Sequence, residues 1–409
     1  LLNTQELLAI RQKFPFFDRQ QAESAIIYLD NAATTQKPAL VIECLTQIWE
    51  NGCANVHRSS HTLANQLTER YENARNICAS FINAQSSNEI VWTTGATEAI
   101  NLIAHSWGRQ NIQSGDVILI TAMEHHANLL PWQQLCLQTG ATLKVIPVLE
   151  SAELDLQLLD TLLKEKVKLL AITHVSNVLG TINPIQQIIA RCHQYNCKVL
   201  VDGAQAMAHL PIDVQQLDCD FYVCSGHKCF APEGTGFLYG KKALLDAMPP
   251  WKTGGEMVKS VAFHSATYQP TPLKFEAGTP NISATIAFAQ ALLFLQSHDR
   301  IALLQHEKDL TALAELHLSE IAGLQRHSTA EKKSSIVALT IEGCQSMDLA
   351  ALLDEQNIAV RSGHLCAMPL VKKLTNNGIL RASFCFYNSA DEVMAFVAAL
   401  KQSVSLLRD

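Results

Sequence analysis

The sequence has few charged residues, no excess of positive charge and no long apolar run. Charged residues make up 17% of the 409 residues, and 31 Lys+Arg against 38 Asp+Glu leave a formal net charge of −7. Proteins that bind nucleic-acid phosphates need the opposite balance, so we expect no nucleic-acid partner. The most apolar stretch, residues 282–295, is broken by Ser283, Thr285 and Gln290 and is too short to span a bilayer, so we expect no membrane insertion.

The twelve cysteines do not form the framework of a secreted, disulfide-bonded protein. They are spread over the whole chain, and no two of them form a Cys-x-x-Cys pair. Residues 1–17 carry scattered charges and lack the order of charged, apolar and small residues found in a signal peptide. We therefore expect a cytoplasmic protein with reduced, mostly buried thiols. Glycine and proline are also scarce, at 18 and 13 residues, so no flexible linker between independent modules is expected.

Short apolar runs alternate with helical patterns between residues 89 and 240. The runs cover residues 90–92, 117–120, 143–148, 169–172, 199–201, 221–223 and 236–239. Their length and their lack of strict alternation predict strands covered on both faces, and the helical patterns between them predict a mainly parallel α/β sheet. We expect a large domain over residues 26–295, a small α+β domain over residues 296–409, and an N-terminal segment, residues 1–25, that packs with the small domain.

Polar side chains follow most of these predicted strands, at the edge of the sheet where ligands of open α/β folds bind. Asp202 ends one apolar run, and a buried carboxylate there needs either a cation, such as a protonated pyridine nitrogen, or a role as a helix cap. Lys228 follows another run, and a desolvated lysine is the nucleophile that Schiff-base chemistry requires. Together they indicate one shared pocket.

Two further segments carry features of a ligand site. Gly95, Ala96 and Thr97 lie between a strand and a helix start, which favours a bound phosphate, although a capping box with Glu98 explains the same residues. The adjacent His125 and His126 have no neighbouring carboxylate or cysteine at ligand spacing, so we expect no metal. One of the two rings is better suited to stack on an aromatic cofactor and to move protons.

Cys366 is the cysteine whose surroundings favour reactivity. It lies in the polar, glycine-containing segment of residues 361–367 (RSGHLCA), where an arginine and a histidine are close enough in sequence to stabilise a thiolate. Cys224 and Cys229 flank Lys228 but alternate with apolar residues, so we expect them to be packing residues. The segment therefore predicts an exposed nucleophile.

Taken together, these motifs resemble those of the pyridoxal-phosphate-dependent cysteine desulfurases of the aminotransferase class V group, specifically the group II (Suf/Csd-type) desulfurases and selenocysteine lyases. The resemblance extends over almost the whole chain. It is carried by residues 28–35 (YLDNAATT), 55–58 (NVHR), 97–101 (TEAIN), 124–128 (EHHAN), 201–205 (VDGAQ), 225–228 (SGHK), 275–281 (FEAGTPN), 361–367 (RSGHLCA) and 381–383 (RAS). It implies the aspartate-aminotransferase-like fold (fold type I), with a seven-stranded sheet in the large domain.

The resemblance also implies a role for each site residue. Lys228 would carry pyridoxal 5'-phosphate, His125 would stack on its ring, and Cys366 would be the nucleophile. The other cofactor contacts would be Ala96, Thr97, Asn177, Asp202, Gln205, Ser225, His227 and, from the neighbouring subunit of a homodimer, Thr279. Ala32, His57, Arg58, Asn177, Arg361 and Arg381 would contact the substrate, with Arg381 holding its carboxylate.

The implied reaction converts L-cysteine to L-alanine, and the sulfur passes as a persulfide on Cys366 to a small acceptor protein of the SufE/CsdE type. Selenocysteine and cysteine sulfinate present the same ammonium and carboxylate groups, so activity on both is expected as well. A kynureninase-like lyase and a transaminase stay open as other enzymes of this fold, although Cys366 argues against both. A non-catalytic scaffold is the alternative of a different class, which the combination of Asp202, Lys228, Arg381 and Cys366 disfavours.

Overall fold

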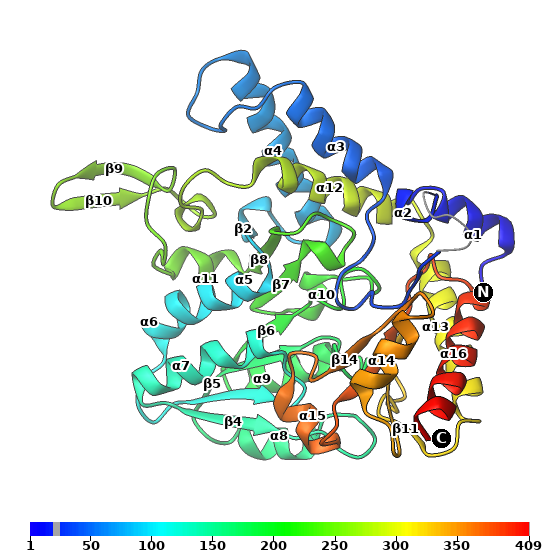
Figure 1. The fold of residues 1–409 in the computed structure, drawn as a ribbon. Helices are drawn as coiled ribbons and strands as arrows, with labels where there is room; N and C mark the ends of the chain where they lie inside the picture. The colour runs from blue at the N-terminus through cyan, green and yellow to red at the C-terminus, as the bar shows by residue number, and fades with distance from the viewer. Residues whose placement is uncertain (19–24, 409) are drawn as a thin grey trace.

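Figure 1 shows the computed structural model, which describes residues 1–18 and 25–408. Its centre is a seven-stranded sheet in the order β2-β8-β7-β6-β5-β3-β4. Neighbouring strands are parallel except that β8 runs antiparallel to both β2 and β7. The strands are β2 (Ile90–Thr93), β3 (Val117–Thr121), β4 (Thr142–Ile146), β5 (Val167–Thr173), β6 (Lys198–Asp202), β7 (Phe221–Ser225) and β8 (Gly236–Gly240). The predicted mainly parallel seven-stranded α/β sheet is confirmed.

Both faces of this sheet are buried, which explains why its strands are apolar without alternating. In β5, Leu169 and Ala171 face one core and Leu170 and Ile172 face the other. The first core is closed by α5 (Ala96–Ile103) and α7 (Leu130–Thr139), and the second by α4 (Thr62–Phe81), α9 (Ile185–Gln194) and α12 (Ile282–Gln296). The remaining helices of this part are α3 (Ala39–Glu50), α6 (Arg109–Asn111), α8 (Leu156–Leu162), α10 (Val214–Leu217) and α11 (Lys242–Ala247).

Two helical patterns of the sequence are each divided in the structure. The pattern over residues 97–107 becomes α5 followed by one wider helical turn, Ala104–Gly108. The pattern over residues 282–318 becomes α12 and α13 (Arg300–Leu318), because Asp299 between them caps α13 by accepting hydrogen bonds from the amides of Ile301 and Ala302. α12 packs on α3 and α4, whereas α13 packs on α16 (Ala390–Arg408). The division at residue 295 stays a prediction.

The C-terminal part forms a separate antiparallel sheet in the order β11-β12-β15-β14. Its elements are β11 (Leu324–Arg326), β12 (Ile336–Ile341), α14 (Ser346–Asp354), β14 (Arg361–Gly363), α15 (Met368–Leu374), β15 (Ile379–Ser383) and α16. A short strand near the N-terminus, β1 (Ile27–Tyr28), pairs in parallel with β13 (Ile358–Ala359) of this part. The chain from residue 27 onward therefore starts at the small sheet and then crosses to the large one.

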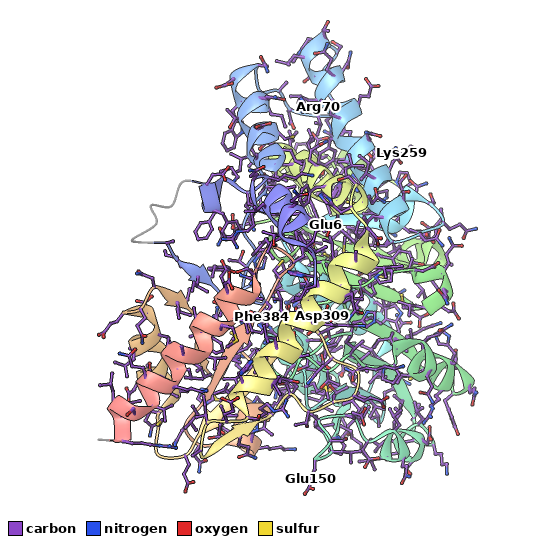
Figure 2. The ribbon with its side chains drawn as sticks, turned by 90° about the vertical axis from the view of Figure 1, so that its right-hand side faces the viewer. Glu6, Arg70, Glu150, Lys259, Asp309 and Phe384 are labelled. Atoms are coloured by element: carbon purple, nitrogen blue, oxygen red, sulfur yellow. The ribbon has the colours of Figure 1, made fainter. Side chains whose placement is uncertain are left out.

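The first residues also contact the C-terminal part. The N-terminal helices are α1 (Thr4–Arg11) and α2 (Pro15–Asp18). Figure 2, which labels Glu6 and Asp309, shows α1 beside α13, and the amide of Leu2 donates to His306 Nδ1 of α13 at 3.0 Å. Arg11 Nη1 lies 2.8 Å from Glu392 Oε1 of α16. The expected N-terminal segment ran to residue 25, and its residues 19–24 lie outside the described part of the chain.

An exposed hairpin projects from the large domain between α11 and α12 (Figure 1). Its strands are β9 (Val258–Ala262) and β10 (Ser265–Tyr268), and Phe263 in its turn is fully exposed. No helix or strand was predicted for this segment. None of the described helices is long and apolar enough to cross a bilayer.

Candidate active site

One pocket lies at the carboxyl ends of the central strands, between the two sheets. Its cavity volume is about 190 Å³, and it is partly open to solvent. Thirteen of the predicted site residues line it: Ala32, Ala96, Thr97, His125, Asn177, Asp202, Gln205, Ser225, His227, Lys228, Arg361, Cys366 and Arg381. Segments that are far apart in the sequence therefore meet at one site.

Lys228 provides an amine with reduced basicity. It ends the single helical turn Gly226–Lys228 that follows β7, and burial lowers the pKa of its amine to about 8. The Asp202 carboxylate opposes this shift, and the Arg381 charge adds to it. A neutral amine is therefore well populated near pH 8, as a nucleophile or a proton acceptor requires.

The backbone beside Lys228 is held by residues of the N-terminal loop. The carbonyl of His227 accepts hydrogen bonds from Thr35 N at 3.2 Å, from the hydroxyls of Thr34 and Thr35 at 3.1 Å each, and from Lys37 Nζ at 2.9 Å. Burial lowers the pKa of Lys37 to about 8 as well. These contacts fix the peptide that carries Lys228. No role was predicted for Thr34, Thr35 or Lys37, although residues 28–35 are among the motifs that carry the family resemblance.

Asp202 is a buried acid at the end of β6, with 6% of its surface exposed. Its Oδ1 accepts a hydrogen bond from the amide of Ala204 at 3.0 Å. Burial raises the pKa of this carboxyl, while that hydrogen bond and the Lys228 charge act in the opposite direction. Among the described residues no basic group lies within ion-pair distance of Asp202, so the site suits a cationic ligand group such as the predicted pyridinium.

His125 is a neutral imidazole whose tautomer is set by the backbone. Its Nδ1 accepts a hydrogen bond from the amide of Ala127 at 3.0 Å, so the ring proton is on Nε2. Burial and, to a lesser extent, the Lys228 charge lower the pKa of His125 to about 4. The residue can therefore stack on an aromatic ring and donate a hydrogen bond from Nε2 at neutral pH.

The start of α5 forms the end of the pocket suited to an anion. Gly95 has φ +150°, and a Cβ there would lie 3.3 Å from Ser225 Oγ, so the tight approach favours glycine. Ser225 Oγ accepts a hydrogen bond from the amide of Ala96 at 2.9 Å. Glu98 also caps the start of this helix, because its Oε2 accepts a hydrogen bond from the amide of Thr94 at 2.6 Å. The helix start, Thr97 and Ser225 together fit a phosphate.

Arg381 has N–H donors left for a ligand. Only 2% of its surface is exposed. Its Nη1 donates to the carbonyl of Asn177 at 2.7 Å and its Nη2 to Asp30 Oδ1 at 2.8 Å. Its Nε is buried with no hydrogen-bond partner in the described part of the chain, and Arg361 Nη1 lies 3.5 Å from Asp30 Oδ2. An orphaned guanidinium donor at this pocket suits a substrate carboxylate.

Cys366 lies in a short, strained loop between β14 and α15. Leu365 and Cys366 have φ of +51° and +54°, a left-handed conformation that costs on the order of 1–3 kcal/mol for each such residue. Asn177 Nδ2 donates to the Leu365 carbonyl at 2.7 Å, and His126 N donates to the Cys366 carbonyl at 2.7 Å. Leu365 is buried, whereas Cys366 is exposed. The loop therefore presents a thiol at the pocket on a fixed backbone.

Three predicted residues lie outside the pocket of their own chain. His57 and Arg58 line a different cavity together with Gly278 and Pro280, which flank the exposed Thr279. His57 Nε2 lies 2.9 Å from Glu72 Oε1, and Arg58 Nε lies 3.2 Å from Glu256 Oε2. The role of Thr279 was expected at the neighbouring subunit's site. His57 and Arg58 were expected near the mouth of the pocket, and the roles of all three residues stay predictions.

The low basicity of Lys228 leads to a pH prediction for the cofactor-free protein. Only the neutral amine attacks a carbonyl, so the rate of combination with pyridoxal phosphate should rise with pH and be half-maximal near pH 8. An ordinary lysine would give a midpoint above about pH 10. Samples reduced with borohydride at successive times, with the peptide of Lys228 followed by mass spectrometry, measure this rate. A midpoint above pH 10 would contradict the assigned environment.

The chain is similar to known proteins over almost its whole length. The family model for aminotransferase class-V matches residues 27–396. A probable cysteine desulfurase of Vibrio cholerae is 46% identical over 399 residues, which cover 98% of each chain. The crystal structure of the cysteine desulfurase CsdA from Escherichia coli, in its S-sulfonic acid form, superposes with a TM-score of 0.90 at 40% identity and covers 99% of both chains. A cysteine desulfurase of Thermococcus onnurineus in its apo form gives a TM-score of 0.93 at 33% identity, again over 99% of both chains. The chain therefore belongs to the aminotransferase class-V family and, within it, to the pyridoxal-phosphate-dependent cysteine desulfurases.

Proposed function

We propose that this protein removes the sulfur of L-cysteine and carries it as a persulfide on Cys366. The observation that carries the proposal is the composition of the pocket, which combines the buried Lys228, the buried Asp202 and the exposed thiol of Cys366. Lys228, Asp202, His125 and the start of α5 would hold pyridoxal phosphate. This cofactor supplies a carbonyl carbon for the substrate amine and a ring that withdraws electrons from the substrate's α-carbon.

The substrate is oriented by the residues at the small-domain side of the pocket. Arg381 Nε–H would donate to the carboxylate of cysteine, and Arg361 adds a second positive charge on the same side. Lys228, with its lowered pKa, would take the proton from the α-carbon as a general base. Its position is kept by the four hydrogen bonds to the neighbouring His227 carbonyl, so little reorganisation is needed when the proton moves.

Cys366 performs the sulfur transfer as a thiolate. It attacks the substrate sulfur, so that a sulfur–sulfur bond forms and the bond between the substrate's sulfur and its β-carbon breaks. The electron pair of the broken bond stays with the three-carbon fragment, which takes up one proton at that carbon and one at the α-carbon and leaves as alanine. The protonated Lys228 is the acid available in the pocket for these protons, and the neutral His125 can donate a hydrogen bond from Nε2. The sulfur then remains on Cys366 until an acceptor thiolate removes it.

Two protein partners are proposed, a second copy of this chain and a small sulfur-acceptor protein. The residues His57, Arg58 and Thr279 lie away from the pocket of their own chain, which supports a homodimer in which they serve the neighbouring subunit's site. The exposure of Cys366 supports transfer to a second protein, of the small SufE/CsdE type. The twelve cysteines are all free thiols, which supports action in the reducing cytoplasm.

The test of the proposed function uses the two exposed cysteines, Cys366 and Cys53. In the presence of a reducing thiol as acceptor, Cys366→Ala should form alanine from L-cysteine at least about 100-fold more slowly than the wild type, because the nucleophile is lost. Cys53→Ala should retain the wild-type rate. Mass spectrometry of the unreduced wild type should find one additional sulfur atom on the peptide of Cys366. Full turnover by Cys366→Ala would exclude the assigned nucleophile.

A further inference from the structure

His126 contacts the Cys366 loop at two points, at the nucleophile and two residues after it. Its backbone amide donates to the Cys366 carbonyl at 2.7 Å, and its Nε2 accepts a hydrogen bond from the amide of Met368 at 3.1 Å. Met368 is the first residue of α15, so the second contact fixes the point at which the loop enters that helix. Because Nε2 acts as an acceptor, the proton of the His126 ring is on Nδ1, opposite to the tautomer of His125.

The loop has few contacts of its own that could keep it in place. Within it, the amide of Ala367 donates to the carbonyl of His364 at 2.9 Å. The two left-handed residues, Leu365 and Cys366, would relax to ordinary backbone angles if the loop were released. Three hydrogen bonds with residues of the large domain oppose this relaxation. Asn177 donates to the Leu365 carbonyl, His126 N donates to the Cys366 carbonyl, and His126 Nε2 accepts from the Met368 amide.

We propose that His126 is a positioning residue for Cys366, and that its imidazole holds the nucleophile loop in the geometry needed for attack on the substrate sulfur. This inference rests on the proposed function, because it concerns the step in which Cys366 takes the sulfur. His126 belongs to the large domain. Cys366 belongs to the C-terminal part, in the loop that joins β14 to α15. The histidine therefore sets the distance from the thiol to the part of the pocket that holds Lys228.

His126 affects only the transfer of sulfur to Cys366, whereas His125 and Lys228 serve the other steps of the reaction. His125, the preceding residue, lines the pocket beside Lys228, whereas His126 does not line that pocket. The sulfur–sulfur bond requires the thiolate in line with the carbon–sulfur bond, and a displacement of about 1 Å costs up to about 100-fold in rate. Removal of the α-proton by Lys228 requires no contribution from the loop. Loss of the His126 imidazole should therefore slow sulfur transfer selectively.

The test compares His126→Phe with His126→Gln in the holoenzyme. Phenylalanine removes the acceptor for Met368 N–H, whereas glutamine places an amide oxygen near the position of Nε2 and restores it. With L-cysteine we expect kcat to fall about tenfold in His126→Phe with KM unchanged, and to recover to within about twofold of the wild type in His126→Gln. His126→Leu, which also lacks the acceptor, repeats the measurement if the phenylalanine ring prevents cofactor binding.

L-cysteine sulfinate separates positioning of the thiol from a general structural effect. Its carbon–sulfur bond breaks with release of sulfur dioxide, which water converts to sulfite, while the electron pair stays on the carbon that becomes the methyl group of alanine. No thiolate is needed, so His126→Phe should process this substrate at the wild-type rate. Hydrogen exchange should show faster exchange at the amide of Met368 in His126→Phe than in His126→Gln.

Two results would overturn the inference. One is a wild-type kcat for L-cysteine in His126→Phe, and the other is an equal loss with L-cysteine and L-cysteine sulfinate. If the proposed function itself were wrong, the wild type would form no persulfide on Cys366. The two outcomes are therefore distinguishable in a single series of assays.

Discussion

Replacing Lys228 with alanine should reduce alanine formation from L-cysteine by about 10⁴-fold. The change removes both the amine that bonds to the cofactor and the base that takes the α-proton, and each role contributes a large factor. The visible absorption of the cofactor should also shift to that of the free aldehyde, because no Schiff base with the protein forms. Turnover is measured as alanine released, and the absorption spectrum is recorded on the same samples.

Lys228→Arg is the matched control for this prediction. It keeps the positive charge opposite Asp202, but a guanidinium stays protonated and cannot act as a nucleophile or a base at neutral pH. Its activity should be as low as that of the alanine variant. If either variant kept more than a hundredth of wild-type turnover, the assignment of Lys228 would be wrong. If Lys228→Arg alone were active, a purely electrostatic role would explain the residue.

Replacing Asp202 with asparagine should lower kcat about 1000-fold and weaken cofactor binding. The carboxylate lies at the dry end of β6 and has no cationic partner among the described residues, so its charge is available to a protonated ring nitrogen. Loss of that charge removes the electrostatic stabilisation of the electrons released from the α-carbon. Asparagine preserves the volume and can still accept the hydrogen bond from the Ala204 amide.

Asp220 offers a control at the opposite end of the same sheet. It is also fully buried, and its carboxylate lies 2.9 Å from His193 Nε2 and 3.2 Å from Lys198 Nζ. Asp220→Asn should lower the melting temperature but leave kcat within about twofold, because it touches no pocket residue. Equal kinetic losses in the two variants would show that the Asp202 effect reflects stability. Wild-type kcat in Asp202→Asn would contradict its role directly.

The large sheet was predictable because its strands obey a simple local rule. Each is a short apolar run buried on both faces, and the polar residues that follow the runs end at one edge. This rule led directly to Asp202 and Lys228, and the structure places both at one pocket. The cysteine loop was predictable from composition, since a polar, glycine-containing segment favours exposure, and Cys366 is exposed.

The remaining features depend on contacts between distant segments, which a local pattern does not show. The hydrogen bond from the Met368 amide to His126 joins residues 242 positions apart. The bond from Arg381 to the Asn177 carbonyl spans 204 positions, and it uses a backbone atom that every residue type carries. The projecting hairpin, β9 and β10, was missed because its side chains are exposed and so show no apolar pattern.

The contacts of residues 27–37 bear on how the protein folds. Within this segment β1 pairs with β13 of the C-terminal part, and Thr34, Thr35 and Lys37 bond to the His227 carbonyl 190 to 193 residues away. Contacts so distant in sequence form late, because closing such large loops costs chain entropy before the contacts compensate for it. The backbone of Lys228 is therefore secured only when the beginning, middle and end of the chain have met. Cofactor attachment should thus follow the last folding step and, by mass action, stabilise only the completed fold.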